Sequence, residues 1–448
     1  MTKSRLAIGS GIPGRLAACA GVVPIAGVLI AGCTATRPDT DVAWAINVGG
    51  PGYDGIDGTR YEAEASVTGG TPGRMESVKG SQDPVLYATY RVGDIRVDHP
   101  IANGTYDITF HFAEPEGLGP RERLFDTFAE GRQVIDDLDV MMFRDGKVES
   151  ALTFTVPNVV VADGELNIAF EASASEPVLS ALVVRDKNRP KPRWELVWRD
   201  EFDGDELDNA KWNIDVWPQR KVNDEDQAYT ARAKNLRIED GLLVIEAHNE
   251  DYEGAKYTSG RVHSAGKGDF LYGRFEVRAK LPRGQGTWPA IWMLPSDPFA
   301  YATTCDEGDW QGNPDCDAWP NSGEIDIMEH VGYQMNHVHG TVHTRAYYWL
   351  VWEQRKGRIL LDQVADAFHV YSVEWMPERI DVFVDDTLYF SYMNEHEGWK
   401  EWPFDKPFHM ILNIAVGGAW GRAGGPIDDT IFPQRILVDY VRVYQRSG

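Results

Sequence analysis

The feature that most constrains the fold is a period-two alternation of apolar and polar residues, which recurs along the chain while amphipathic helix patterns are scarce. Two clear runs are residues 106–112 (YDITFHF) and residues 275–281 (FEVRAKL). Residues 380–384 and 387–392 flank Asp385-Asp386, which is a hairpin signal. Successive strand side chains face opposite sides of a sheet, so each run predicts a strand with one buried face. We therefore expect an all-β chain in which each half is an antiparallel β-sandwich.

Two breaks divide the chain, whose 448 residues exceed one typical domain. The first is the short polar stretch TATRPDTD after Cys33, and the second is RDKNRPKPR at residues 185–193, where charge and prolines interrupt strand-like sequence. The predicted parts are an export signal (1–33), a tether (34–41), a smaller β-sandwich (42–187), a linker (188–193) and a C-terminal domain (194–448).

The N-terminus predicts export. Lys3, Arg5 and Arg15 precede an apolar stretch that is short for a membrane span and ends in small residues. Its last four residues, IAGC, resemble the lipobox of bacterial lipoproteins, which implies that Cys33 is lipidated and anchors the protein at the cell surface or in the periplasm. The alternative is an ordinary cleaved signal. No later segment is apolar enough to cross a membrane.

The net charge restricts the kinds of ligand that the protein can bind. The formal net charge is -25, and residues 1–32 hold three basic and no acidic residues, so a chain without them is more negative still. Such a surface repels polyanions and excludes a nucleic-acid partner, which leaves neutral or cationic ligands.

Cys305 and Cys316 bound the acidic loop CDEGDWQGNPDC, and in an oxidising compartment they predict a local disulfide, with free thiols as the alternative.

The run EIDIMEH, residues 324–330, carries three carboxylates in a strand-like segment. By strand parity Glu324 and Asp326 share a face, whereas Glu329 should point the other way. One extra residue near Met328, a β-bulge, would return Glu329 to the shared face. Like charges so close cannot all ionise, so one acid should hold a proton near neutral pH. Glycoside hydrolysis requires such a pair of a carboxylic acid and a carboxylate.

Two other interpretations of this run stay open. One is a solvated strand edge, although that does not explain the apolar residues between the acids. The other is a metal site, because four histidines follow closely: His330, His337, His339 and His343. No HExxH spacing is present, and His339, Thr341 and His343 share one face of the next predicted strand.

Several separate motifs between Trp194 and Arg446 resemble glycoside hydrolase family 16, specifically its laminarinase-like endo-β-1,3-glucanases. They are GRFEVRAKLPRGQGTWPAIWMLP, GEIDIMEHVG, VHGTVHT, LNIAVGGAWG and FPQRILVDYVRVYQ, in the order of the family. The resemblance implies a β-jelly-roll with a concave cleft and a retaining double displacement. It places the nucleophile at Glu324, the acid/base at Glu329 and an assisting residue at Asp326.

The same resemblance implies the residues that contact sugar: Trp288, Trp292, Trp420, His343, Asn223 and Arg261. Fourteen of the 15 tryptophans lie beyond residue 193, a surplus that favours aromatic platforms for a ligand. Core packing is the alternative for Trp288 and Trp292, and a loop anchor is the alternative for Trp420. A structural calcium is also implied, through Glu201, the Gly241 carbonyl and Asp439, with solvated acids as the alternative. We expect no cofactor for catalysis.

Residues 42–187 resemble the malectin-like carbohydrate-binding domain, on AINVGGPGYDGIDG, VLYATYR, NGTYDITFHFAE, RLFDTFAEG and DDLDV. The chain reads PEGLGP after HFAE, where such domains often carry an aromatic pair that touches sugar. The domain is therefore either a sugar binder, with Tyr53, Tyr87 and Tyr90 as candidates, or a spacer.

Together these observations predict a monomeric, exported endo-glycosidase that cuts internal β-1,3 linkages of laminarin-type β-glucans. The alternatives are a β-agarase or other galactan hydrolase of the same family, and a non-catalytic glucan-binding protein. The negative charge disfavours sulfated substrates. The intact set of three acids disfavours the binding protein.

Overall fold

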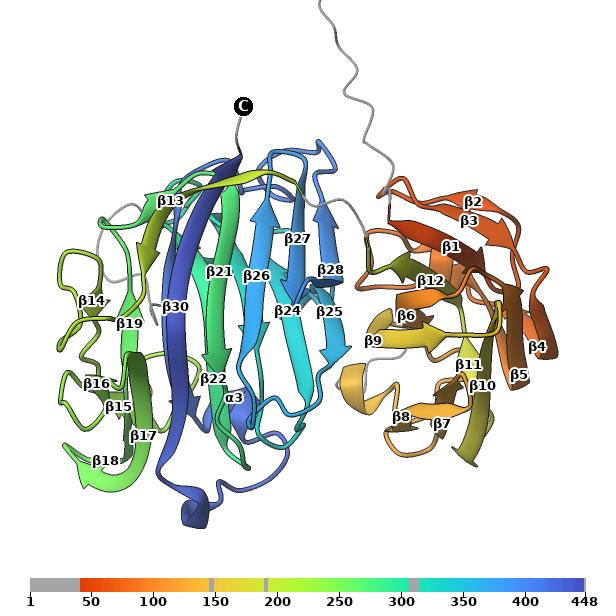
Figure 1. The fold of residues 1–448 in the computed structure, drawn as a ribbon. Helices are drawn as coiled ribbons and strands as arrows, with labels where there is room; N and C mark the ends of the chain where they lie inside the picture. Colours follow the sequence, from red (N-terminus) through yellow and green to blue (C-terminus); the bar gives the residue numbers. More distant parts are fainter. Residues whose placement is uncertain (1–40, 145–148, 189–191, 306–312, 314, 447–448) are drawn as a thin grey trace, which may run out of the picture. The chain divides into compact units, whose positions relative to one another are not determined.

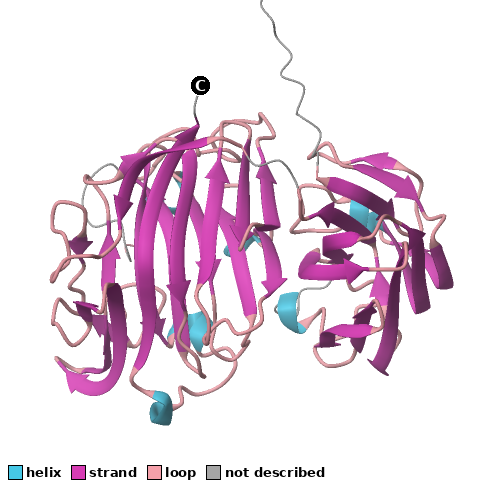
Figure 2. Cartoon of the chain, viewed as in Figure 1, coloured by secondary structure: helices cyan, strands magenta, loops and turns pink. Residues whose placement is uncertain are grey.

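The structure is a computed structural model that describes residues 41–144, 149–188, 192–305, 313 and 315–446 (Figure 1). The predicted export signal with Cys33, residues 34–40 of the tether and the centre of the linker lie outside the described residues. Strands dominate and the helices are short (Figure 2), so the all-β prediction is confirmed. Within the described ranges, no helix has the length and apolar character needed to cross a membrane.

The N-terminal sandwich consists of two groups of strands around one core. One group has the order β9 (Leu152–Val161), β6 (Gly104–Phe112), β12 (Ala181–Asp186), β1 (Val42–Asn47), β3 (Arg60–Ala63), β2 (Tyr53–Asp54). The other has the order β11 (Val178–Leu179), β5 (Thr89–Pro100), β10 (Glu165–Ala174), β7 (Leu124–Ala129), β8 (Arg132–Leu138), with β4 (Val67–Arg74) on β5. Ile108 and Phe110 of β6 pack between them against Phe170 of β10.

Strand β6 differs from the simple alternating pattern, because its polar residues are buried as well: Asp107, Thr109 and His111. A second small core covers that face, to which the short helix α1 (Val85–Ala88) contributes Leu86 and Tyr87. The Tyr87 hydroxyl lies 2.9 Å from His111 Nδ1. The polar residues therefore face a second, partly polar layer instead of water.

The C-terminal sandwich has an inner and an outer sheet. The inner order is β14 (Asn213–Ile214), β19 (Arg261–His263), β29 (Phe408–Val416), β22 (Thr287–Pro295), β23 (Glu324–Glu329), β24 (His337–His343), β25 (Arg355–Leu360), with β20 (Asp269–Phe270) on β29. The outer order is β15 (Gln227–Tyr229), β18 (Ala255–Ser259), β17 (Leu242–Tyr252), β30 (Gln434–Arg446), β21 (Gly273–Lys280), β26 (His369–Trp375), β27 (Arg379–Val384), β28 (Thr387–Met393). β13 (Trp194–Asp200) pairs with β30, and β16 (Leu236–Glu239) pairs with β17.

Apolar side chains from both sheets form one large core. Ile291 and Ile325 come from the inner sheet, and Phe275 and Val441 come from the outer sheet. The predicted hairpin joins β27 to β28 through Asp385 and Asp386, whose φ angles of 47° and 66° match a type I′ turn. The jelly-roll prediction is confirmed. The face of the inner sheet that points away from this core can therefore carry a functional site.

Candidate active site

Strand β23 contains the bulge that the sequence predicted. Opposite it on β22, Asp326 pairs with Trp292 and Met328 pairs with Ile291, so Ile327 is the extra residue. On the other edge, the register with β24 also shifts between Asp326 and Glu329. The two edges agree, so the bulge belongs to β23 itself.

The bulge sorts the side chains of β23 onto two faces. Its apolar residues are fully buried in the core: Ile325, Ile327 and Met328. Its three acids line one cavity of about 520 Å³: Glu324, Asp326 and Glu329. A cavity of this size is typical of a ligand site. The parity conflict in the sequence is therefore resolved by one inserted residue.

An indole N–H group holds each glutamate. Trp319 Nε1, in α2 (Ala318–Asn321), donates to Glu324 Oε2 at 3.0 Å. Trp288 Nε1, on β22, donates to Glu329 Oε1 at 3.1 Å. These donors orient the carboxyl groups without adding charge to the site, and both hydrogen bonds lower the pKa of their acceptors.

Burial dominates the electrostatics of the three acids. It raises the pKa of Glu324, Asp326 and Glu329, and repulsion from Glu329 adds to the effect at Glu324. Asp326 is 2% exposed and shares a hydrogen bond with Glu324, which raises the pKa of Asp326 and lowers that of Glu324. The cluster therefore keeps protons near neutral pH, and Asp326 is placed to give its hydrogen bond to an ionised Glu324.

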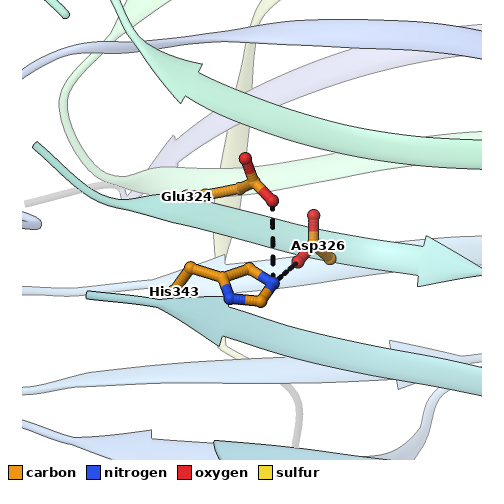
Figure 3. A group of neighbouring side chains, drawn as sticks. All are labelled: Glu324, Asp326 and His343. Carbon is orange, nitrogen blue, oxygen red and sulfur yellow. Dashed lines mark ion pairs between the residues drawn. The ribbon is translucent and has the colours of Figure 1, made fainter. Parts of the chain in front are cut away.

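His343 lies beside two of these acids on the neighbouring strand β24 (Figure 3). Its Nε2 atom is 3.7 Å from Glu324 Oε1 and 3.5 Å from Asp326 Oδ2. Burial lowers the pKa of His343 to about 3, so the ring is neutral at neutral pH and acts as a polar neighbour instead of a cation.

These three groups bring potential metal-ligand atoms within 4.8 Å of one another. A neutral imidazole and two carboxylates form a donor set that a divalent metal could use. The raised pKa of Glu324 and of Asp326 opposes that use, because metal binding requires both carboxyl groups to lose their protons. Acid–base chemistry uses the same arrangement with those protons in place.

Aromatic rings build the cleft wall beside Glu329. Trp288 packs edge-on against Trp420 of α3 (Gly418–Gly421), with 5.6 Å between ring centroids. Trp420 in turn contacts His339 at 5.0 Å. Trp288 and Trp292 both line the cavity, so they face the cleft and not the core.

Arg261 and Asn223 extend the lining of the cleft. Arg261 Nε donates to Asp215 Oδ2 at 2.8 Å, and its guanidinium lies 4.8 Å from the centre of the Trp292 ring. The Asn223 amide donates to the buried Glu225 at 3.2 Å. All six residues predicted to contact sugar line the same cavity: Trp288, Trp292, Trp420, His343, Asn223 and Arg261.

The sequence interpretation missed several cleft residues: Glu225, Trp319, Trp349, Gln354, Lys356 and Asn413. Trp319 could have been predicted from the sequence, because it lies only five residues before Glu324, on the other side of the turn that precedes the strand. Asn413 left none, because its role comes from the pairing of β22 with β29, where it accepts a hydrogen bond from Trp292 Nε1 at 2.8 Å.

The residues predicted to bind calcium are engaged elsewhere. Both oxygens of Glu201 accept hydrogen bonds from Arg442 at 2.8 Å, and Asp439 forms an ion pair with Arg278. Gly241 lies in the turn between β16 and β17 with φ of 73°. A calcium ion would have to displace both guanidinium groups, so this arrangement fits the ion poorly and the calcium site stays a prediction.

Cys305 and Cys316 form a disulfide, and Cys316 lines the cleft cavity. In the N-terminal sandwich, Glu114 at the end of HFAE forms a buried ion pair with Arg123, whose Nε donates to Glu114 Oε2 at 2.6 Å. Tyr87, a sugar-binding candidate there, is buried in the core. Tyr53 and Tyr90, the other two candidates, are only half-buried, so both interpretations of that domain stay predictions.

Comparison with known protein families matches residues 216–441 to Glycosyl hydrolases family 16 and residues 42–190 to the malectin domain. A β-glucanase from Rhodothermus marinus is 51% identical over 267 residues, which cover 58% of this chain and 88% of that protein. The crystal structure of the laminarinase from the same organism is 50% identical, with a TM-score of 0.52, and covers 57% of this chain and 99% of that one. The structure of SCLam, a non-specific endo-β-1,3(4)-glucanase, is 40% identical with a TM-score of 0.50, and covers 57% of this chain and 95% of that one. This chain belongs to glycosyl hydrolase family 16.

Proposed function

We propose that this protein is a retaining endo-glycosidase that hydrolyses internal β-1,3 linkages of laminarin-type β-glucans. The observation that carries the proposal is the bulged strand, which brings Glu324 and Glu329 to one face of a tryptophan-lined cleft with raised pKa values. The names of the β-glucanase and laminarinase relatives support the choice of substrate.

The first half of the reaction forms a covalent intermediate. Glu324, ionised, attacks the anomeric carbon while Glu329 gives its proton to the glycosidic oxygen, so the carbon–oxygen bond breaks and the leaving chain departs as an alcohol. Asp326 donates its hydrogen bond to Glu324, which lowers the pKa of the nucleophile against the larger effect of burial. Trp319 and Trp288 hold the two carboxyl groups in place.

The second half releases the sugar. Glu329, now a carboxylate, takes a proton from water, and the water oxygen bonds to the anomeric carbon as the ester to Glu324 breaks. Two displacements at one carbon retain its configuration. Every proton in the cycle is carried by a residue of the cleft or by water.

The cleft suits a neutral sugar chain. Its walls carry the indole rings of Trp288, Trp292 and Trp420, which present flat apolar faces to sugar rings. The net charge of -25 slows the approach of sulfated galactans.

A polysaccharide screen tests the proposal. Purified protein is incubated with laminarin, lichenan, agarose and κ-carrageenan, with the Glu324→Gln variant as the matched control. We expect reducing ends from laminarin with the native protein and none with the variant. Release from a galactan alone would replace the glucanase by a galactan hydrolase, and release from none of the four would favour a binding protein.

We also propose that the protein is exported and anchored through a lipid on Cys33, acting as a monomer outside the cytoplasm. The basic, apolar and small-residue pattern of residues 1–33 supports export. Metabolic labelling with a radioactive fatty acid should mark the native protein and not Cys33→Ala. Labelling of both would contradict the anchor.

A further inference from the structure

An exposed apolar segment lies next to the cleft. It comprises Trp349, Leu350, Val351 and Trp352, whose exposed fractions are 50%, 56%, 37% and 53%. The first three form the short 3-10 helix η2 (Trp349–Val351). Four consecutive large apolar residues in contact with water are uncommon on a soluble surface and mark a binding surface. We call residues 349–352 the aromatic platform.

The backbone fixes the shape of this segment. The Trp352 N–H donates to the Trp349 carbonyl oxygen at 3.2 Å, which closes a turn. Trp352 has φ of 65°, in the left-handed region, where a bulky residue other than glycine costs on the order of 1 kcal/mol. Such conformations cluster at ligand-binding segments. The turn presents its large side chains outward at an energetic cost that core packing does not explain.

The platform continues the catalytic cleft. Trp349 lines the same cavity as Glu324 and the other two acids. The preceding residue, Tyr348, packs edge-on against Trp319 at 5.8 Å between centroids, and Trp319 donates to Glu324. Trp319, Tyr348 and the adjacent Trp349 therefore connect the nucleophile to the platform.

We propose that the aromatic platform is an outer binding site for a neutral β-glucan chain that extends beyond the catalytic cleft. This inference rests on the proposed function. Sugar rings offer apolar C–H faces that pack on tryptophan, and a chain bound at the carboxylates lies in the cavity that Trp349 lines. A membrane surface is the competing occupant of an exposed apolar segment, but the shared cavity connects the platform to the substrate.

Binding and kinetics test the platform together. The inactive Glu324→Gln protein is compared with the same protein carrying Trp349→Ala and Trp352→Ala in sedimentation with insoluble β-1,3-glucan. We expect a loss of roughly tenfold in affinity, which corresponds to one stacked ring. In the active protein, the same pair of changes should lower kcat/KM more for laminarin than for a short laminari-oligosaccharide, and Trp349→Phe should restore part of the difference. Val160→Ala, an exposed apolar residue on β9, is the matched control and should leave both readouts unchanged.

The outcomes separate the two proposals. If the native protein cleaves laminarin but the platform variants bind insoluble glucan as tightly as their parent, the platform inference is wrong and the proposed function stands. Loss of binding to vesicles of phosphatidylcholine and phosphatidylglycerol, with glucan binding unchanged, would assign the segment to membranes. If the native protein does not cleave laminarin and the Glu324→Gln protein does not bind glucan, both proposals fail.

Discussion

The hydrogen bond from Trp288 to Glu329 makes a quantitative prediction about catalysis. The indole N–H lies 3.1 Å from the carboxylate oxygen and lowers the pKa of Glu329 against the larger effect of burial. Phenylalanine keeps an aromatic ring at this position but has no donor. The Trp288→Phe variant should therefore raise the pKa of Glu329.

The size of the shift follows from the strength of the bond. A hydrogen bond to a charged group contributes about 1.5–3 kcal/mol, and one pKa unit corresponds to about 1.4 kcal/mol. The alkaline limb of the pH profile reports loss of the proton from the acid/base, so it should move to higher pH by about 1 to 2 units. Trp319 and not Trp288 donates to Glu324, so the limb that reports ionisation of the nucleophile should move much less.

The assay is kcat/KM for laminarin between pH 4 and pH 10, measured by release of reducing ends. Trp292→Phe is the matched control, because Trp292 lies on the same face of β22 but donates to Asn413 and not to a carboxylate. Both variants should lose some activity, and only Trp288→Phe should shift the alkaline limb upward. An unchanged limb, a downward shift, or equal shifts in both variants would refute the reasoning.

Three further predictions concern stability and metal. Burial raises the pKa of Glu324 in the folded protein, so the stability that this carboxyl group gives is present below its unfolded-state pKa of about 4.3 and is lost as the pH rises. The Glu324→Gln variant should therefore have a Tm about 2–4 °C higher than the native protein at pH 8 and the same Tm near pH 4, although its turnover should fall by more than about 10³-fold. A lower Tm of the variant at pH 8, measured by calorimetry, would contradict this. Replacing Cys305 and Cys316 by serine should lower the free energy of unfolding by about 2–3 kcal/mol, because the loop between them is no longer closed by the disulfide in the unfolded chain. An unchanged midpoint of urea unfolding would show that the disulfide does not contribute to stability. Because arginines engage Glu201 and Asp439, adding calcium after EDTA treatment should not change Tm, and a rise of several degrees would support the calcium site.

Strand parity carried most of what the sequence could predict. Alternating runs identified β6, β21, β27 and β28, and the parity conflict at Glu329 predicted the bulge that β23 contains. These features are local, since period two and one inserted residue are visible within a single strand.

Features that depend on the pairing of distant strands could not be predicted in this way. Asn413 reaches Trp292 only because β29 pairs with β22, and Arg442 reaches Glu201 only because β30 pairs with β13. The second pairing engages a carboxylate that the family resemblance implied as a calcium ligand. The resemblance to laminarinases predicted residues that line the cleft, but the hydrogen-bond partners of these residues depend on which strands pair in the sheet.

The most direct test of the central claim is to trap the covalent intermediate. The protein is treated with a 2-deoxy-2-fluoro laminaribiosyl fluoride, digested, and analysed by mass spectrometry. We predict one added disaccharide on the peptide that contains EIDIME, bound through Glu324, and none in the Glu324→Gln variant. An adduct on another residue, or laminarin hydrolysis with inversion of the anomeric carbon and no adduct, would contradict the account.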